Sequence, residues 1–312
     1  MPDIWSSEYW AKKGPVDLYM WRKRLGAPQP GAAPLPVLFL VHGSSLCART
    51  GFDLPVPGKP DYSMMDWFAT RGFDVWTMDH ENYGRSSRTK GNSDIASGVA
   101  DLRAAFPVVK RETGRNAAHF YGSSSGALRA GAFANACPEN VASLVLDAFT
   151  WTGKDSPTLV KRAERLDEFR ASNVRKVDRA FFHSIFNRDK PGLAEDGIAD
   201  IFADFEMQFG DTVPTGTYVD MCANLPVVDP AKIRCATMIS RGEHDGIATL
   251  ADLVAFYEAL PVNIDKQFVI LPGQAHVGTL GTNRTRAWHM IQAFLTLPAR
   301  KDFLIGAKAA AE

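Results

Sequence analysis

The chain has 312 residues, of which 46% are hydrophobic and 22% charged, as expected for a globular protein of one large domain or of one domain with an insertion. Lys+Arg and Asp+Glu balance at 35 each, so no overall positive charge favours nucleic acid. The longest apolar runs, such as residues 35–41, are far shorter than a membrane span. The composition therefore argues against nucleic-acid and membrane partners.

The cysteines show no C-x-x-C pair and no His/Cys cluster with zinc spacing; they are Cys47, Cys137, Cys222 and Cys235. We therefore expect no metal or cofactor, and buried free thiols in a reducing compartment, with two disulfides as the open alternative. Residues 1–5 lack a basic segment followed by an apolar core, so we expect no secretory signal and a cytoplasmic protein. Whether the chain forms a homo-oligomer stays open.

Strands and helices alternate along most of the chain. Residues 5–11 and 16–23 flank a turn at 12–15 and predict a hairpin. The unbroken apolar run 35–41 predicts a strand that is covered on both faces. Further strands are predicted at 73–78, 116–121, 143–146, 235–240 and 266–271, and helices after Ser63 and at 93–112, 127–136, 250–260 and 283–297. The fold class is therefore α/β, with a doubly wound, mostly parallel sheet.

Two segments depart from this alternation. Residues 46–62 predict a long loop, and Pro107 predicts a kink or a restart within the helix at 93–112. Residues 149–228 carry many charges and, near residues 198–209, apolar residues at helical spacing. We therefore expect an α/β core formed by residues 1–148 and 229–312, and a helical cap or lid at 149–228, with a helical elaboration that has no gating role as the alternative.

Gly122-Ser123-Ser124-Ser125-Gly126 lies between a predicted strand and a predicted helix. The pattern G-x-S-x-G in this context is typical of a nucleophile elbow, a turn so sharp that the central serine is strained and exposed. The glycines would be needed because side chains there would collide with the neighbouring strand and helix. Ser124 is therefore the candidate nucleophile.

A serine nucleophile needs a general base, usually a histidine that a carboxylate orients. His276 is the best placed of the seven histidines, because it follows the last predicted strand and precedes the last helix. Asp245, after the strand at 235–240, gives the chain order Ser, Asp, His and is the favoured acid. Asp147 is the alternative acid, and Asp79 is interpreted as a carboxylate that stabilises a loop.

A tetrahedral intermediate also needs donors for its oxyanion. We expect the backbone N–H of Ser125 to be one donor and that of Ser44 to be the other, with Ser45 as the alternative to Ser44. His42 precedes this loop, and we interpret it as a residue that organises the loop and not as a second base.

These motifs together resemble the α/β-hydrolase fold superfamily, in its serine esterase-like branch with a helical cap. The resemblance covers residues 16–146 and 229–298, and the motifs that carry it are His42-Gly43, the loop 79–86, the elbow 122–126, Gly242 to Asp245 and Gly273 to His276. The chain departs from the pattern at Asn82, where a glycine usually stands, and in the length of the loop 46–62. The resemblance implies cofactor-independent hydrolysis through an acyl-enzyme.

Carboxylic esters are the first substrate class that this resemblance implies. Serine at 124 argues against the dehalogenase and epoxide hydrolase branches, which use a carboxylate nucleophile. The alternatives are a carbon–carbon bond or lactone hydrolase on the same residues, or a non-catalytic ligand-binding protein of this fold. A small, partly apolar substrate would suit the aromatic residues Trp67, Trp76, Trp151, Phe181, Phe182, Phe186 and Tyr218.

Overall fold

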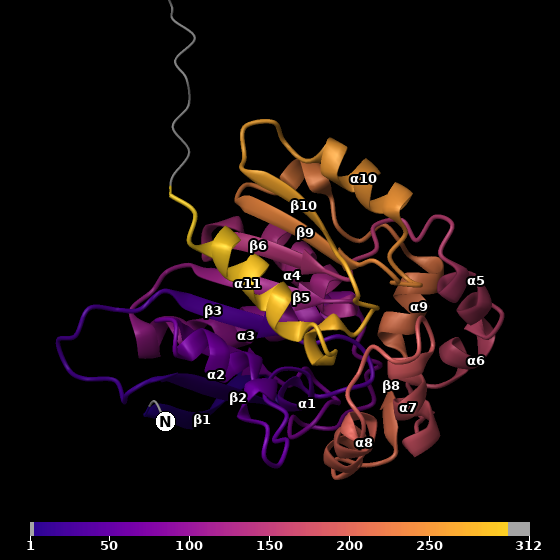
Figure 1. The fold of residues 1–312 in the computed structure, drawn as a ribbon, viewed down its shortest axis with the longest axis horizontal. Helices are drawn as coiled ribbons and strands as arrows, with labels where there is room; N and C mark the ends of the chain where they lie inside the picture. Colours follow the sequence, from indigo (N-terminus) through magenta and orange to yellow (C-terminus); the bar gives the residue numbers. More distant parts are fainter. Residues whose placement is uncertain (1–2, 299–312) are drawn as a thin grey trace, which may run out of the picture.

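The centre of the protein is an eight-stranded sheet with the order β1-β2-β4-β3-β5-β6-β9-β10 (Figure 1). The computed structural model describes residues 3–298; residues 1–2 and 299–312, at the ends of the two predicted core segments, lie outside the described part. The strands are β1 (Ile4–Lys13), β2 (Val16–Leu25), β3 (Val37–Val41), β4 (Asp74–Met78), β5 (Ala118–Ser123), β6 (Val141–Asp147), β9 (Ala236–Gly242) and β10 (Lys266–Leu271).

The strands from β4 to β10 pair in parallel, and β1 and β2 form an antiparallel hairpin at one edge. Every residue of β3 and β4 is buried, which agrees with the unbroken apolar sequence of β3. The hairpin joins the parallel strands through β2, which pairs antiparallel with β4. Between these two strands the buried Arg22 of β2 donates to both carboxylate oxygens of Asp74 of β4, at 2.8 and 2.6 Å. The mostly parallel sheet and the hairpin agree with the predictions.

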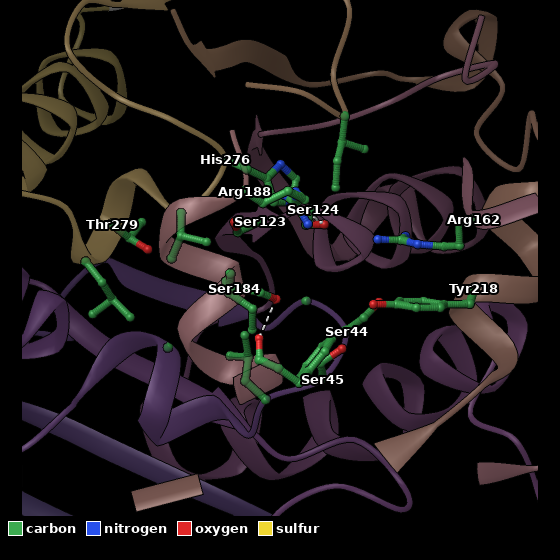
Figure 2. Close-up of a pocket in the computed structure, with 18 of the residues that line it drawn as sticks. Ser44, Ser45, Ser123, Ser124, Arg162, Ser184, Arg188, Tyr218, His276 and Thr279 are labelled. Carbon is green, nitrogen blue, oxygen red and sulfur yellow. Dashed lines mark hydrogen bonds between the residues drawn. The ribbon is translucent and has the colours of Figure 1, made fainter. Parts of the chain in front are cut away.

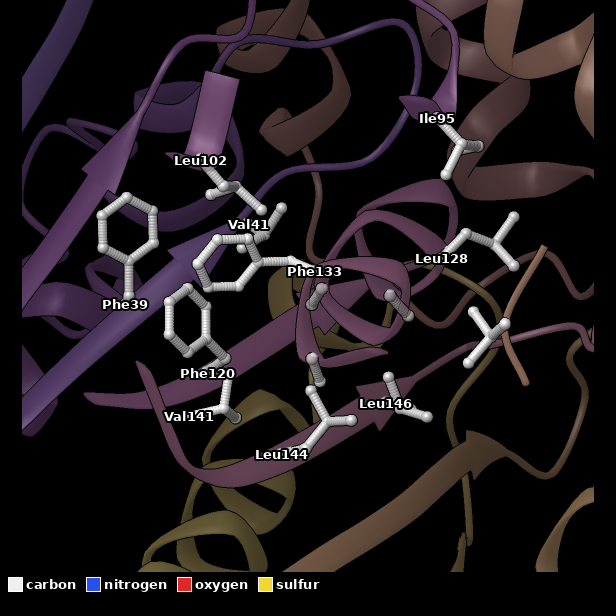
Figure 3. Close-up of a cluster of buried hydrophobic side chains, with 14 of the residues drawn as sticks. Phe39, Val41, Ile95, Leu102, Phe120, Leu128, Phe133, Val141, Leu144 and Leu146 are labelled. Carbon is white, nitrogen blue, oxygen red and sulfur yellow. The ribbon is translucent and has the colours of Figure 1, made fainter. Parts of the chain in front are cut away.

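Helices cover both faces of the sheet. The face that carries α3 (Ile95–Thr113), α4 (Ser125–Ala136) and α10 (Leu250–Ala259) holds the larger core, where Phe39, Phe120 and Phe133 meet (Figure 3). The Phe120 ring lies 5.4 Å from that of Phe39 and 5.1 Å from that of Phe133, between centroids. The other face is covered by α2 (Met64–Ala69) and α11 (Arg284–Leu295). This is a doubly wound α/β fold.

The segment between β6 and β9 is mostly helical and lies at one end of the sheet (Figure 1). It contains α5 (Pro157–Ala163), α6 (Leu166–Ala171), α7 (Arg179–Asn187), α8 (Ile198–Met207) and α9 (Gly216–Ala223). It also contains a two-stranded antiparallel sheet of β7 (Val174–Lys176) and β8 (Thr212–Pro214), which was not predicted. A separate apolar cluster, with Phe182 and Phe202 from this segment and Leu54 and Tyr62 from the core, joins the two parts.

A buried carboxylate adds a polar contact between the core and the segment that lies between β6 and β9. Glu206 of α8 accepts from the backbone N–H of Cys47 at 3.0 Å and from the Thr50 hydroxyl at 2.5 Å. These donors lie at the start of α1 (Ala48–Phe52), a short helix inside the segment that was predicted to be a loop. Burial raises the pKa of Glu206 to about 7.

Three local predictions can be compared with the structure. Ser63 caps α2 by accepting from the N–H of Asp66 at 3.0 Å, as predicted. Helix α3 continues through Pro107, so no new helix starts there. The cysteines are free, as predicted; Cys47 and Cys137 are buried and the other two are partly buried. None of the helices within residues 3–298 has the length and apolar character needed to cross a membrane.

Candidate active site

Ser124 lies at a strained turn between β5 and α4. Its backbone has φ +57° and ψ −125°, a conformation that residues with a side chain rarely adopt. Its N–H donates to the carbonyl oxygen of Asp147 at 2.9 Å, which fixes the turn against the end of β6. The side chain of Ser124 lines a pocket beyond the carboxyl ends of the parallel strands. This arrangement agrees with the predicted elbow.

The glycines on either side of this turn allow three backbone segments to approach one another. A Cβ atom on Gly122 would lie 2.4 Å from the carbonyl oxygen of Gly126, and one on Gly126 would lie 2.1 Å from that of Val41. Both distances are far below van der Waals contact, so a side chain at either position would push α4 away from the sheet. The pattern G-x-S-x-G is therefore a packing requirement of this turn.

His276 lies in the loop after β10 and reaches back to Ser124. The Ser124 hydroxyl donates to Nε2 of His276 across 2.9 Å. β10 is at the edge of the sheet, but its loop passes closely over the end of β9, where the N–H of His244 donates to the carbonyl of Gln274 at 2.9 Å. Gly242 permits this crossing, because a Cβ there would lie 2.6 Å from the carbonyls of Gln274 and Ala275.

Asp245 holds the other side of the His276 ring. Nδ1 of His276 donates toward both carboxylate oxygens of Asp245, each at 3.0 Å. The N–H groups of Ile247 and Ala248 also donate to Oδ1 of Asp245, at 2.8 and 3.1 Å. Burial alone would raise the pKa of Asp245, but His276 and these N–H donors outweigh it and hold the pKa below its usual value. Asp245 is therefore a buried anion that fixes the imidazole.

The other carboxylates considered from the sequence have different partners. Asp147 accepts from the hydroxyls of Tyr121 and Ser240, each at 2.7 Å, and burial raises its pKa. Asp79 accepts from the backbone N–H groups of Ala48 and Arg85, at 2.8 and 2.9 Å, as expected of a carboxylate that stabilises a loop. Neither is bonded to His276, so the structure brings Asp245, and not Asp147, to the histidine.

The predicted oxyanion residues lie side by side. The hydroxyls of Ser44 and Ser125 are 2.8 Å apart, and Ser44 is also 2.7 Å from the hydroxyl of Thr217 on α9. His42 is fully buried; its Nδ1 donates to the carbonyl of Gly43 at 2.8 Å and its Nε2 accepts from the N–H of His80 at 3.1 Å. Burial lowers the pKa of His42 well below its usual value, so it is a neutral residue that shapes this loop.

The loop 79–86 keeps its turn although Asn82 replaces a glycine. Asn82 has φ +69°, a left-handed conformation that asparagine tolerates better than most residues. Its side chain compensates by donating to the carbonyl of Gly91 at 2.7 Å and accepting from the N–H of Thr89 at 2.5 Å. The substitution is therefore accommodated by local hydrogen bonds.

The pocket above Ser124 is formed jointly by the core and by the segment between β6 and β9 (Figure 2). It is a concave space, partly enclosed and partly open to solvent. Of the aromatic residues considered from the sequence, Phe181 and Tyr218 line it, whereas Trp76 and Phe182 are core. Arg162 and Arg188 also line it; these were not predicted, because only the fold shows which charges of this segment face inward.

No group of His, Cys, Asp and Glu side chains within residues 3–298 has an arrangement that could hold a metal ion. The polar groups around Ser124 are instead a hydroxyl, an imidazole and a buried carboxylate in a continuous hydrogen-bonded chain. Such a chain can raise the nucleophilicity of a serine by accepting its proton.

The fold and this site define the general class of a hydrolase. The model of the alpha/beta hydrolase fold family matches residues 36–278 of the sequence, which is most of the chain. The chain therefore belongs to the α/β-hydrolase fold family, as the sequence motifs indicate. No match was found among curated proteins.

Solved structures of several enzymes are similar to this one over nearly their full length. A bromoperoxidase from Bacillus anthracis has a TM-score of 0.67 at 16% identity, covering 93% of this chain and 99% of that one. An enol-lactonase from Burkholderia xenovorans LB400 has 0.64 at 16%, covering 93% and 100%. The 2-hydroxy-6-oxo-6-phenylhexa-2,4-dienoate hydrolase from Rhodococcus sp. strain RHA1 has 0.65 at 16%, covering 94% and 99%. At these identities the likeness shows the fold alone.

Proposed function

We propose that this protein is a serine hydrolase that cleaves a carboxylic ester through an acyl-enzyme. The observation that carries the proposal is the chain from Ser124 Oγ to His276 Nε2, at 2.9 Å, and from His276 Nδ1 to Asp245, at 3.0 Å. Nucleophile, base and orienting acid are all within hydrogen-bond reach, which is the geometric requirement for general-base activation of a serine.

In the proposed reaction Ser124 Oγ attacks the ester carbonyl while its proton passes to Nε2 of His276. Asp245 stabilises the imidazolium that forms, since its carboxylate is buried and anionic. The N–H groups of Ser125 and Ser44 hold the oxyanion. The C–O bond to the alcohol then breaks, and the alcohol leaves with the proton from His276. Water, deprotonated by His276, attacks the acyl-enzyme and releases the acid and Ser124.

The segment 149–228 has the role of a cap in this proposal. Its residues Arg162, Phe181 and Tyr218 close the pocket opposite Ser124, so this segment selects the substrate while the core performs the chemistry. The mixture of aromatic and charged lining suits a small substrate that is only partly apolar.

The proposal is tested with p-nitrophenyl acetate and a fluorophosphonate probe. Ser124→Ala should abolish ester hydrolysis, a loss of about a thousandfold or more, while the melting temperature shows that the protein is folded. Fragmentation mass spectrometry of the labelled protein should place the probe on Ser124 and not on its serine neighbours. The control Ser6→Ala, at an exposed position of β1, should retain wild-type turnover and labelling. Retained hydrolysis in Ser124→Ala would contradict the proposal.

A further inference from the structure

The pocket has a cationic side that the proposed chemistry does not use. Arg162 of α5 and Arg188, just after α7, line it together with Tyr218 of α9. Figure 2 shows the Arg162 side chain extending from its helix toward Ser124, beside the ring of Tyr218. These residues all come from the segment between β6 and β9, whereas Ser124 belongs to the core.

Arg162 has no acidic partner within residues 3–298. Its guanidinium stacks on the Tyr218 ring, whose centroid is 3.8 Å from the guanidinium carbon. A guanidinium stacked in this way keeps its edge of N–H donors free, and that edge matches the two oxygens of a carboxylate. The stacking also fixes the direction of the side chain, so a ligand loses less free energy in ordering it.

A second guanidinium lies on the same aromatic ring. The guanidinium carbon of Arg175 is 4.3 Å from the centroid of Tyr218 and 4.6 Å from that of Phe181, and Arg175 donates to the hydroxyl of Ser45. It too lacks a carboxylate partner in the described part of the chain, and its Nε is buried without an acceptor. Arg175 does not line the pocket, but its charge adds to the positive potential there.

Arg188 differs because an acid neutralises it. Its Nε is 2.8 Å from Oδ1 of Asp189, and its NH2 group is 3.2 Å from Oδ2. Oδ2 of Asp189 also accepts from the backbone N–H of His276, at 3.3 Å, so this pair supports the histidine loop. Asp245 is likewise satisfied by His276. The guanidinium groups that lack a carboxylate partner on this side of the pocket are therefore those of Arg162 and Arg175, among the residues that the structure describes.

The phenol of Tyr218 responds to this charge. Burial raises the pKa of a phenol, yet Arg162 and Arg175, with the hydrogen bond to Ser45 and a smaller effect of Arg188, lower the pKa of Tyr218 to about 8. An anion brought into the pocket would meet the same potential. Since the pocket is partly closed to water, the attraction is stronger there than at an open surface.

We propose that the substrate carries a carboxylate remote from the scissile ester, and that Arg162 binds this carboxylate. The inference rests on the proposed function, because it names the substrate class of the same site. Arg162 would act as a specificity residue: the carboxylate it holds fixes the ester carbonyl over Ser124. Half-esters of dicarboxylic acids have this chemistry, with an anion at one end and an ester at the other.

The test compares two esters that differ in one charge: mono-p-nitrophenyl adipate and its neutral methyl ester, methyl p-nitrophenyl adipate. We expect the wild-type kcat/KM for p-nitrophenol release to be about tenfold to a hundredfold higher for the acid, the range of a charge-assisted hydrogen bond. Arg162→Gln should abolish this preference, so that the ratio of kcat/KM for the acid to that for the neutral ester falls to about one. The control Lys161→Gln removes the same charge from an exposed position of the same helix and should keep the preference.

Equal wild-type rates on the two esters, or a preference that survives Arg162→Gln, would overturn the inference while leaving ester hydrolysis by Ser124 intact. Calorimetry with Ser124→Ala separates the two proposals, because it measures binding without turnover. In that background the acid should bind about tenfold or more tightly than the neutral ester, and Arg162→Gln should remove the difference. If the wild type cleaves neither ester but this binding difference is present, the anion site stands and the proposed hydrolysis fails.

Discussion

The substitution Asp245→Asn tests how the carboxylate controls His276. Both oxygens of Asp245 face Nδ1 of His276, but only Oδ1 also accepts from the N–H groups of Ile247 and Ala248. In the variant these donors keep the amide oxygen at the position of Oδ1, because an NH2 group there would face two N–H donors. The NH2 group therefore lies at the position of Oδ2 and donates to Nδ1.

This reversal changes the tautomer of His276. With Nδ1 accepting, the ring proton moves to Nε2, the atom that lies 2.9 Å from the hydroxyl of Ser124. A protonated Nε2 cannot accept the serine proton. From the size of this effect in other serine hydrolases with the same geometry, we expect kcat to fall by about ten-thousandfold. That loss corresponds to about 5 kcal/mol in the activation free energy.

The assay is p-nitrophenyl acetate hydrolysis, with melting temperatures to verify folding. Asp147→Asn is the matched control, since Asp147 is also a buried acid at a strand end but bonds to Tyr121 and Ser240. It should lower kcat by less than about tenfold. The reasoning is refuted if Asp245→Asn keeps more than about a tenth of the wild-type kcat, or if Asp147→Asn loses as much activity as Asp245→Asn.

Two further predictions concern stability. The pKa of Glu206 is raised by burial from 4.5 to about 7, so the folded protein binds this proton more tightly than the unfolded chain, and stability falls as the pH rises from 4.5 to about 7. Glu206→Gln lacks this titration. As the pH rises from 4.5 to about 7, the difference in the free energy of unfolding between Glu206→Gln and the wild type, measured by urea unfolding, should therefore shift by about 3 kcal/mol in favour of the variant. A difference that is independent of pH would contradict this. Arg22→Leu removes both hydrogen bonds that Arg22 donates to the buried Asp74, which then keeps only the longer contact with Arg24, at 3.6 Å, and should cost about 3–5 kcal/mol. The double variant Arg22→Leu/Asp74→Leu should recover most of that loss in the same assay; a double variant no more stable than the single one would count against the ion pair.

The features that the sequence predicted well depend on short segments. The buried run that became β3 and the serine turn between Gly122 and Gly126 can be recognised because the reason for each residue lies within a few positions of it. The helix cap at Ser63 is of the same kind. Such local rules also placed His276 at the correct edge of the sheet, because the carboxyl ends of parallel strands meet there.

What the sequence left open depends on contacts between distant segments. Both Asp245 and Asp147 follow buried strands, and only the path of the loop after β10 over the end of β9 decides which acid reaches His276. The short helix α1 lies within a segment that appeared to be a loop, and Glu206, far along the chain, accepts from its first turn. Arg162 stood among many charges, and its inward direction follows from stacking on Tyr218.

The pairing of β6 with β9 has a consequence for how this protein can diversify. Because these strands are neighbours in the sheet, the segment between them leaves and re-enters the core at adjacent positions. Replacement of this segment by a longer or shorter one would leave the register of the strands, and with it the elbow, in place, provided that the new segment also supports the backbone N–H of His276, as Asp189 does. The substrate preference of such a protein can thus diverge quickly while its reaction chemistry is inherited unchanged.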